Sequence, residues 1–534
     1  MLRPAGQEAK QGEIMITRRK LLLNSAAGAA GGLLLPRGAV AQSAPAAVKR
    51  GGTLTVAIFA DPLSCDPHFT GNLQGRAATR AIHDTLFRVN EQGRLAPGLA
   101  ESWQQPDEKT FILKLRAGLK FHDGTPLDAA AVKFNIDRIR DPKTAAAGGI
   151  RAGEITQLDT VEVVDDRTVK LTLKAPFAAF LIPFTDVTGA IASPAAIQKW
   201  GLEYGLHAAG AGPFKLVEYQ KDNRTVLEKN SDFWDKGKPY LDRIVLRPIP
   251  TDSTRLAELR AGGVDMAEAL PLQDVQRLRQ SKEIIVSEKV GYRWEYFGFN
   301  LREEYPGRAK KFRQAFQWAI DREALHQVAY FGTGSIGYDG ILPGSPYHDP
   351  NYKPFKRDMN MAKRLLDESG ISRPVVIKAP LQPDPVKQRA GQVFQATAAE
   401  LGVKVEIEQI DSAGYRNTLQ AGKLPMDLFG WWGYRADPDQ YLGILLHSTG
   451  SYARYNGYSN PKMDELIVAE RTARNDEDRR KSFRQISDLM NEDAAYVPWH
   501  YGSDFKGLSS KVKGFVHWQD AIITFQDIYL EGGA

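Results

Sequence analysis

A single cysteine, Cys65, occurs in a chain of 534 residues. No internal disulfide can brace the fold, and metal or iron–sulfur sites built from several cysteines are excluded. Stability must therefore come from packed hydrophobic cores. Because 534 residues exceed what one ordinary core contains, we expect two or three globular units.

The first forty residues have the pattern of an export signal. Arg18 and Arg19 precede a weakly apolar stretch of Ala, Gly and Leu, and 39–41 supplies a small-residue cleavage site. The paired arginines favour the twin-arginine route. About 15 apolar or small residues are fewer than the roughly 20 that span a bilayer, which disfavours a membrane anchor. We expect a cleaved signal peptide over residues 1–41, ending near Ala41, and a periplasmic protein.

Removal of this signal peptide changes the charge of the chain. Residues 1–41 hold six basic and two acidic side chains, so their loss lowers the formal net charge from +6 to +2. A charge this small gives no general attraction to phosphate, and no nucleic-acid partner is expected. Residues 42–50 follow as a flexible leader, and translation starts at either Met1 or Met15.

Hydrophobic periodicity predicts a mixed α/β fold. Apolar residues alternate over 110–116 and 168–173, as half-buried strands require. Asp128 is placed to cap a helix that follows it. Apolar runs at 375–379 and 403–410 flank a helical pattern, which predicts a β-α-β unit with a parallel sheet.

The sequence motifs of common enzymes and cofactor sites are absent or misplaced. Residues 332–337 match G-x-G-x-x-G, but they follow a helical pattern and precede turn residues, which excludes the strand-loop-helix context of a dinucleotide site. Zinc-protease, hydrolase and P-loop motifs are missing, and the nine histidines lack metal-ligand spacing. We therefore expect no catalytic residues, no cofactor and no metal, in a protein that is not an enzyme.

The most informative segment lies between Phe429 and Asp439. Trp431, Trp432 and Tyr434 offer rigid apolar surfaces, and Arg435 offers a fork of donors for a carboxylate or phosphate. The same residues are equally compatible with the end of a core strand and a surface arginine. Asp437 and Asp439 flank Pro438, where a turn or a helix cap is the default role of a carboxylate.

The chain resembles a known family over nearly its whole mature length. Blocks in the family's order carry this resemblance, at residues 51–54, 66–67, 95–103, 115–127, 210–214, 299–300, 313–322 and 437–439. The family is family five of the extracytoplasmic solute-binding proteins, which bind peptides, nickel and related ligands.

This resemblance implies a two-lobed clamshell of the type II, three-domain kind, with a hinge between its lobes. Domain I, in the first lobe, would combine residues 51–86, 206–297 and 503–534. Domain II, an extension of that lobe, would cover 87–205, and domain III, the second lobe, would cover 298–502. Hinge closure around a ligand favours the closed state by the ligand's differential affinity.

The resemblance also implies the periplasmic binding component of an ABC importer, a monomer that delivers a small organic ligand to permease subunits in the inner membrane. A clamshell sensor for a membrane signalling partner is the alternative that the sequence leaves open. A secreted enzyme with a cofactor is disfavoured by the missing motifs.

One departure from the family bears on the ligand. In peptide-binding relatives an aspartate four residues before the proline of 437–439 pairs with the ligand's α-amino group; here that position is Tyr434, and Arg435 follows. A phenol cannot neutralise an ammonium group, and a guanidinium repels it. We expect peptides with a free amino terminus to bind poorly and an anionic or hydroxylated compound to be preferred.

The ligand contacts that we expect come from this segment. Trp431 corresponds to a cleft aromatic of the relatives, and Trp432 contacts either the ligand or the core. The predicted ligand-binding residues are Trp431, Trp432, Tyr434, Arg435 and Asp437. A nickel ligand is disfavoured, because no histidine lies between Gly430 and Gly443.

Overall fold

A computed structural model describes residues 48–143, 150–428, 430–432 and 437–531. The predicted signal peptide and most of the predicted leader lie outside these residues. Within the described part of the chain, no helix combines the length and the apolar composition that crossing a bilayer requires. Cys65 is buried, and burial raises the pKa of its thiol to about 12, so this side chain packs as a small apolar group.

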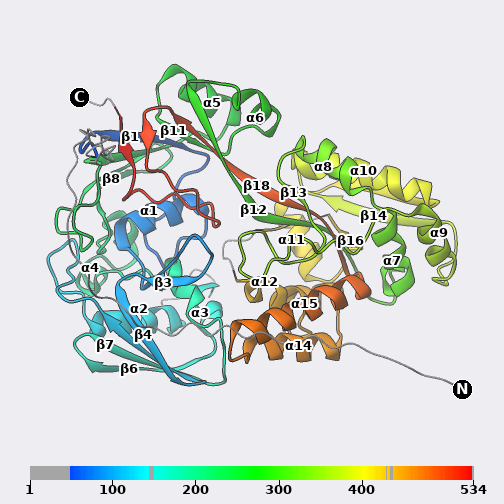
Figure 1. Ribbon diagram of the computed structural model, residues 1–534, viewed down its shortest axis with the longest axis horizontal. Coiled ribbons are helices and arrows are strands. Elements are labelled where there is room, and N and C mark those ends of the chain that lie inside the picture. Colours follow the sequence, from blue (N-terminus) through cyan, green and yellow to red (C-terminus); the bar gives the residue numbers. More distant parts are fainter. Residues whose placement is uncertain (1–47, 144–149, 429, 433–436, 532–534) are drawn as a thin grey trace, which may run out of the picture. The chain divides into compact units, whose positions relative to one another are not determined.

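The largest sheet contains both parallel and antiparallel strands (Figure 1). Its main path has the order β16-β12-β18-β11-β1-β10-β9-β8. The strands on this path are β1 (Thr53–Ile58), β8 (Phe214–Gln220), β9 (Arg224–Lys229), β10 (Arg243–Pro248), β11 (Met266–Glu268), β12 (Ile284–Phe299), β16 (Met426–Asp427) and β18 (Tyr496–Ser509). β1 lies parallel to β10 and β11, which are far from it in the sequence.

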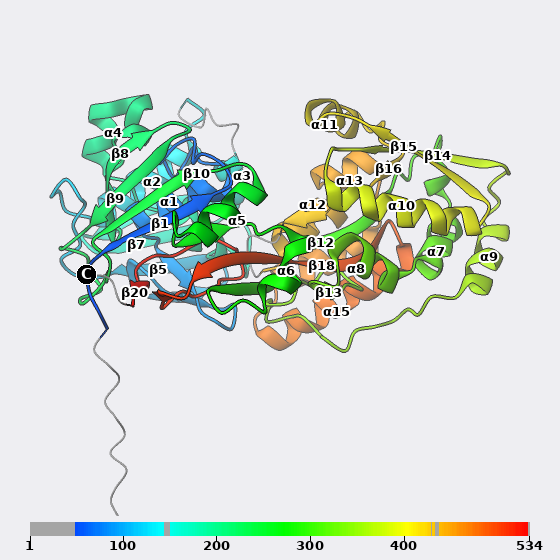
Figure 2. The same cartoon turned by 90° about the horizontal axis from the view of Figure 1, so that it is seen from above.

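Two long strands of this sheet connect separate hydrophobic cores. β12 and β18 pair antiparallel from Ile284 opposite Ser509 to Gly298 opposite Tyr496, with register shifts on the way. At one end they pack with Leu259 and Leu270, and at the other with Phe316 and Phe394. Figures 1 and 2 show both strands running between these parts of the chain.

A second, four-stranded sheet confirms the alternating patterns of the sequence. Its order is β4-β5-β7-β6, made of β4 (Ala100–Asp107), β5 (Thr110–Leu115), β6 (Leu158–Asp165) and β7 (Thr168–Leu173). α2 (Ala129–Arg140) covers it and contributes Val132 and Ile136 to its core. Asp128 caps this helix as predicted, because its Oδ1 accepts a hydrogen bond from the Ala131 N–H at 2.8 Å.

The predicted β-α-β unit is also confirmed. β14 (Val375–Leu381) and β15 (Val403–Gln409) pair in parallel, and α10 (Pro385–Glu400) connects them. Phe394 of α10 stacks on Phe316 of α7 (Lys310–Ala319), with ring centroids 5.1 Å apart. α8 (Arg322–Tyr330) precedes the G-x-G-x-x-G residues, which lead into the short strand β13 (Ser335–Ile336) rather than a helix.

Three helices form a further layer beside β12. They are α12 (Asp439–Leu446), α14 (Pro461–Arg471) and α15 (Asp476–Asp493). Their apolar faces pack with Trp294 and Tyr296 of β12 in one core. The division of the chain into three domains at the predicted boundaries stays a prediction.

Candidate ligand-binding site

The aromatic segment forms a short strand beside β12. β17 (Gly430–Trp432) pairs antiparallel with β12, with Gly430 opposite Glu295, Trp431 opposite Trp294 and Trp432 opposite Arg293. Residues directly opposite each other in an antiparallel pair share a face of the sheet. Trp431 therefore lies on the face of the buried Trp294, while Gly430 lies on the face of Glu295.

The structure places some of the predicted site residues and leaves others undescribed. Trp431 is half-buried and meets Tyr452 edge-on, with ring centroids 5.3 Å apart. The side chain of Trp432 and the whole of Tyr434 and Arg435 lie outside the described residues. Their contacts with a ligand, like those of Trp431 and Asp437, stay predictions.

A buried cluster of charges lies on the Glu295 face, next to Gly430. Arg293 pairs with Glu295 and lies 3.9 Å from Asp384, which caps the first turn of α10. The Tyr330 hydroxyl donates to Glu295 at 2.5 Å. A Cβ added at Gly430 would come 2.4 Å from Glu295 Oε2, so glycine is required for this carboxylate to approach the β17 backbone.

Lys387 brings a second cation to this cluster. Its ammonium donates to Gln382 Oε1 at 3.0 Å, and burial, with the nearby Arg293, lowers its pKa below the ordinary value. Burial raises the pKa of Asp427, the neighbouring acid, to about 6. The cluster therefore combines two cations, Arg293 and Lys387, with the carboxylates of Glu295, Asp384 and Asp427. Sequence analysis missed Arg293 and Lys387, because only the register of β12 and the start of α10 bring them beside β17.

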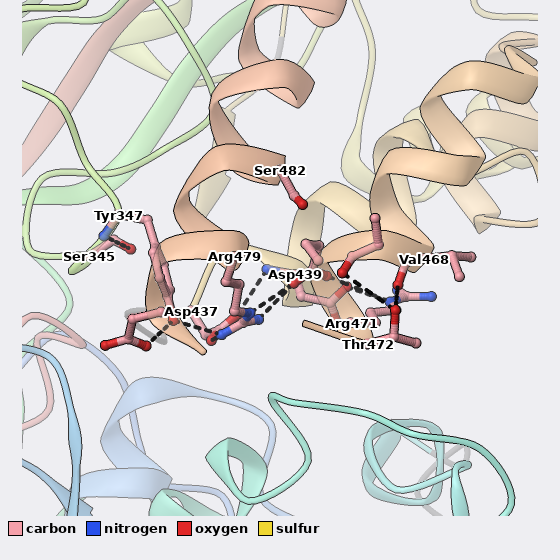
Figure 3. Close-up of polar contacts among 12 residues, drawn as sticks. Ser345, Tyr347, Asp437, Asp439, Val468, Arg471, Thr472, Arg479 and Ser482 are labelled. Atoms are coloured by element: carbon pink, nitrogen blue, oxygen red, sulfur yellow. Dashed lines mark hydrogen bonds and ion pairs between the residues drawn. The ribbon is translucent and has the colours of Figure 1, made fainter. Parts of the chain in front are cut away.

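A second charged cluster holds the residues that follow the aromatic segment (Figure 3). Arg479 of α15 donates to both carboxylate oxygens of Asp437, at 2.5 and 2.9 Å, and Asp437 Oδ1 also accepts the Asp439 N–H at 3.1 Å. The predicted turn role of Asp437 is therefore confirmed, whereas Pro438, the N-cap residue of α12, provides no side-chain cap. Arg479, its principal partner, is distant in the sequence and was not predicted.

Glu470 completes this second cluster. Its Oε2 accepts hydrogen bonds from Arg479 Nε and Nη2 at 3.0 and 2.8 Å. Burial and the Asp439 carboxylate raise the pKa of Glu470 well above its ordinary value, which favours a protonated acid hydrogen-bonded to Asp439. Burial opposes the charge on Arg479, but Asp437 and Glu470 outweigh it and raise the pKa of Arg479.

The described residues contain no group of three or more His, Cys, Asp or Glu side chains arranged to hold a metal ion. The buried His500 lies beside the half-buried His326, with His326 Nδ1 and His500 Nε2 3.1 Å apart. β17 thus lies between an aromatic core on the face of Trp431 and a buried charged cluster on the face of Gly430.

Comparisons with known proteins identify the family of the chain. Residues 94–453 match the family described as bacterial extracellular solute-binding proteins, family 5 Middle. The glutathione-binding protein GsiB of Pectobacterium atrosepticum is 31% identical over 490 residues, which cover 88% of this chain and 93% of that protein. GsiB of Escherichia coli K12 is 28% identical, with 90% of this chain and 94% of that protein covered.

Solved structures show the same fold. DppA of Helicobacter pylori, in complex with the peptide STSA, aligns with a TM-score of 0.78 at 26% identity, covering 90% of this chain and 99% of DppA. AgaA of A. tumefaciens R10, in complex with agropinic acid, aligns with a TM-score of 0.76 at 26% identity over 90% and 99% of the two chains. The predicted type II clamshell fold is thereby confirmed, and the chain belongs to the bacterial extracellular solute-binding proteins of family 5.

Proposed function

We propose that this chain is the periplasmic binding component of an ABC importer for a small organic acid, or another compound rich in acceptor oxygens, which it captures by lobe closure without chemical change. The observation that carries the proposal is the pair of buried cations, Arg293 and Lys387, beside the aromatic strand β17. Arg435, in the sequence between β17 and α12, would add a third cation to the same ligand.

The names of the relatives support this class of ligand. AgaA was solved with agropinic acid, and the GsiB proteins are named for glutathione, which carries two carboxylates and one free ammonium group. DppA was solved with a peptide, STSA. A free amino terminus must find an acid in the site, and the Tyr434–Arg435 pair of this chain supplies none there.

Calorimetric titration with three probes tests the proposal. Agropinic acid should bind most tightly. Glutathione, which adds an ammonium group to its two carboxylates, should bind more weakly, and unblocked trialanine should bind at least tenfold more weakly than agropinic acid, because its ammonium group would lie beside cations. Binding of trialanine as tight as that of the two acids would refute the ligand class. Turnover of any probe would refute a pure binding function.

Two substitutions locate the site. Lys387→Gln should weaken the tightest probe about tenfold to a hundredfold, since one charge-assisted hydrogen bond is lost. Lys378→Gln is the matched control, because Lys378 is an exposed lysine that pairs with Glu408 on the nearby strand β15. Equal affinities for the two variants would remove Lys387 from the ligand site.

A further inference from the structure

Arg471, at the end of α14, contacts residues of two different hydrophobic cores. Its Nε donates to Asp439 Oδ1 at 2.6 Å, at the first residue of α12 and directly after the aromatic segment. Its guanidinium carbon lies 5.6 Å from the centre of the Phe177 ring, which packs on the core of the four-stranded sheet. Its backbone carbonyl accepts the Ala178 N–H at 2.7 Å.

The packing of α12 fixes the position of this guanidinium. A Cβ added at Gly443, in the second turn of α12, would come 2.2 Å from Arg471 Nη2. The glycine thus leaves the space that the arginine head occupies. Arg471 contacts α12 at two places: it donates a hydrogen bond to the carboxylate of Asp439, and its guanidinium lies against the backbone of Gly443.

The surrounding contact between the two cores is thin. A cavity of about 530 Å³ lies beside Arg471, lined from one side by Phe177 and Ala178 and from the other by the turn between α14 and α15. Two exposed ion pairs join the same two surfaces, Arg474 with Glu108 and Arg94 with Asp476. Because water reaches most of this contact, it can form and break without unfolding either core.

We infer that Arg471 is a positioning residue that couples the start of α12 to the Phe177–Ala178 segment, so that displacement of either one is transmitted to the other. The inference rests on the proposed function in one respect: a ligand held at β17 acts next to Asp439 and thereby biases the contact between the cores. The predicted domain division assigns these cores to different lobes, which makes Arg471 a link between the ligand segment and lobe closure.

Reciprocity distinguishes coupling from a merely structural role, because two coupled sites must influence each other. Hydrogen exchange of the ligand-free protein measures both directions. Phe177→Ala should speed exchange of the α12 amides, and Gly443→Ala, which displaces the Arg471 head but keeps every charge, should speed exchange of the Ala178 amide. We expect a change of about tenfold in each case, the ratio that follows from losing one such contact.

Arg484→Ala is the matched control, because Arg484 forms exposed ion pairs on α15 and does not contact either segment through the pairs that the structure records. It should leave both sets of amides unchanged. Arg471→Lys keeps the positive charge but loses the planar guanidinium, and it should speed exchange of the α12 amides and of the Ala178 amide together. If Phe177→Ala affects only residues near 177, and Gly443→Ala only α12, the coupling is refuted. Since no ligand is used, this failure is distinct from a failure of the probes to bind.

Discussion

Removing the guanidinium of Arg479 should destabilise the helical layer beside the ligand segment more than any surface substitution. Arg479 is 7% exposed and makes five hydrogen bonds to three partners, Asp437, Glu470 and Tyr347. In Arg479→Met the apolar stem remains, so the change isolates the lost charge. Asp437 is left buried with the single backbone donor of Asp439.

The magnitude follows from this unpaired carboxylate. Breaking a buried ion pair by removing one partner costs about 3–5 kcal/mol, because the other charge stays desolvated. Glu470 adds little to the loss, since its raised pKa favours the uncharged acid. For a cooperative unit of 150–250 residues, 1 kcal/mol shifts Tm by about 2–4 °C, so the midpoint should fall by about 6–20 °C.

Removing both partners should recover much of this loss. Asp437→Asn alone leaves Arg479 buried and still paired only with Glu470, whereas the combination of Arg479→Met with Asp437→Asn leaves no uncompensated ion. We expect the double variant to lose at least 1.5 kcal/mol less unfolding free energy than the sum of the two single losses, measured by denaturant titration. Arg484→Met is the control on the same helix and should change stability by less than about 1 kcal/mol. Additive single losses, or a drop for Arg484→Met as large as for Arg479→Met, would refute the reasoning.

Three further outcomes follow from buried charges elsewhere. Glu470→Gln should keep the stability of the protein at pH 7 within about 1 kcal/mol, because the burial and the Asp439 carboxylate that raise the pKa of Glu470 favour an uncharged side chain at this position; an equal loss for Glu470→Gln and Arg479→Met in denaturant titration would contradict this. Lys506→Met should cost about 3–5 kcal/mol, since the buried Asp504 loses the ammonium group at 2.9 Å and keeps only His517 as a side-chain partner, and an unchanged Tm would contradict it. Acid should destabilise the fold below about pH 6.5, because buried histidines that are neutral in the native state become protonated on unfolding, at up to about 1.4 kcal/mol per pH unit each. Burial lowers their pKa values to about 3 or 4, at His83, His500, His68 and His122. Scanning calorimetry at pH 7 and 5 checks the sign, and a Tm that rises on acidification would overturn it.

Local patterns in the sequence predicted the elements that depend on local physics. Strict alternation at 110–116 and 168–173 became two paired strands, and Asp128 became a helix cap, because side-chain periodicity and capping are decided within a few residues. The β-α-β unit followed from the same periodicity, since a short helical crossover imposes parallel pairing.

The surroundings of the aromatic segment required pairings that no local pattern contains. Arg293 and Glu295 reach β17 only through the register of β12, more than 130 residues away in the sequence. Arg479 belongs to a helix whose first turn carries Asp476, Glu477 and Asp478, a composition that suggests a solvated surface. Its burial is decided by Asp437 and Glu470, which lie in other elements. Predicting the contact of Arg479 with Asp437 and Glu470 would have required pairing the charged start of α15 with carboxylates that lie far away in the sequence.

The Arg293–Glu295 pair opposite β17 and the Arg479–Asp437 pair that follows β17 suit a segment that is proposed to hold a ligand and to respond to its binding. An apolar core would hold the backbone as firmly, yet its contacts are not directional, whereas the fork of Arg479 fixes the orientation of Asp437. At the Arg471 contact the forces are weaker: one backbone hydrogen bond contributes about 0.5–1.5 kcal/mol, and each ion pair of this exposure up to about 1 kcal/mol. A ligand bound with micromolar affinity supplies about 8 kcal/mol. A differential affinity of about half of that amount, about 4 kcal/mol, exceeds a contact worth about 1–3 kcal/mol and reverses its population, which is why a strong anchor next to β17 and a weak link beyond it form a workable pair.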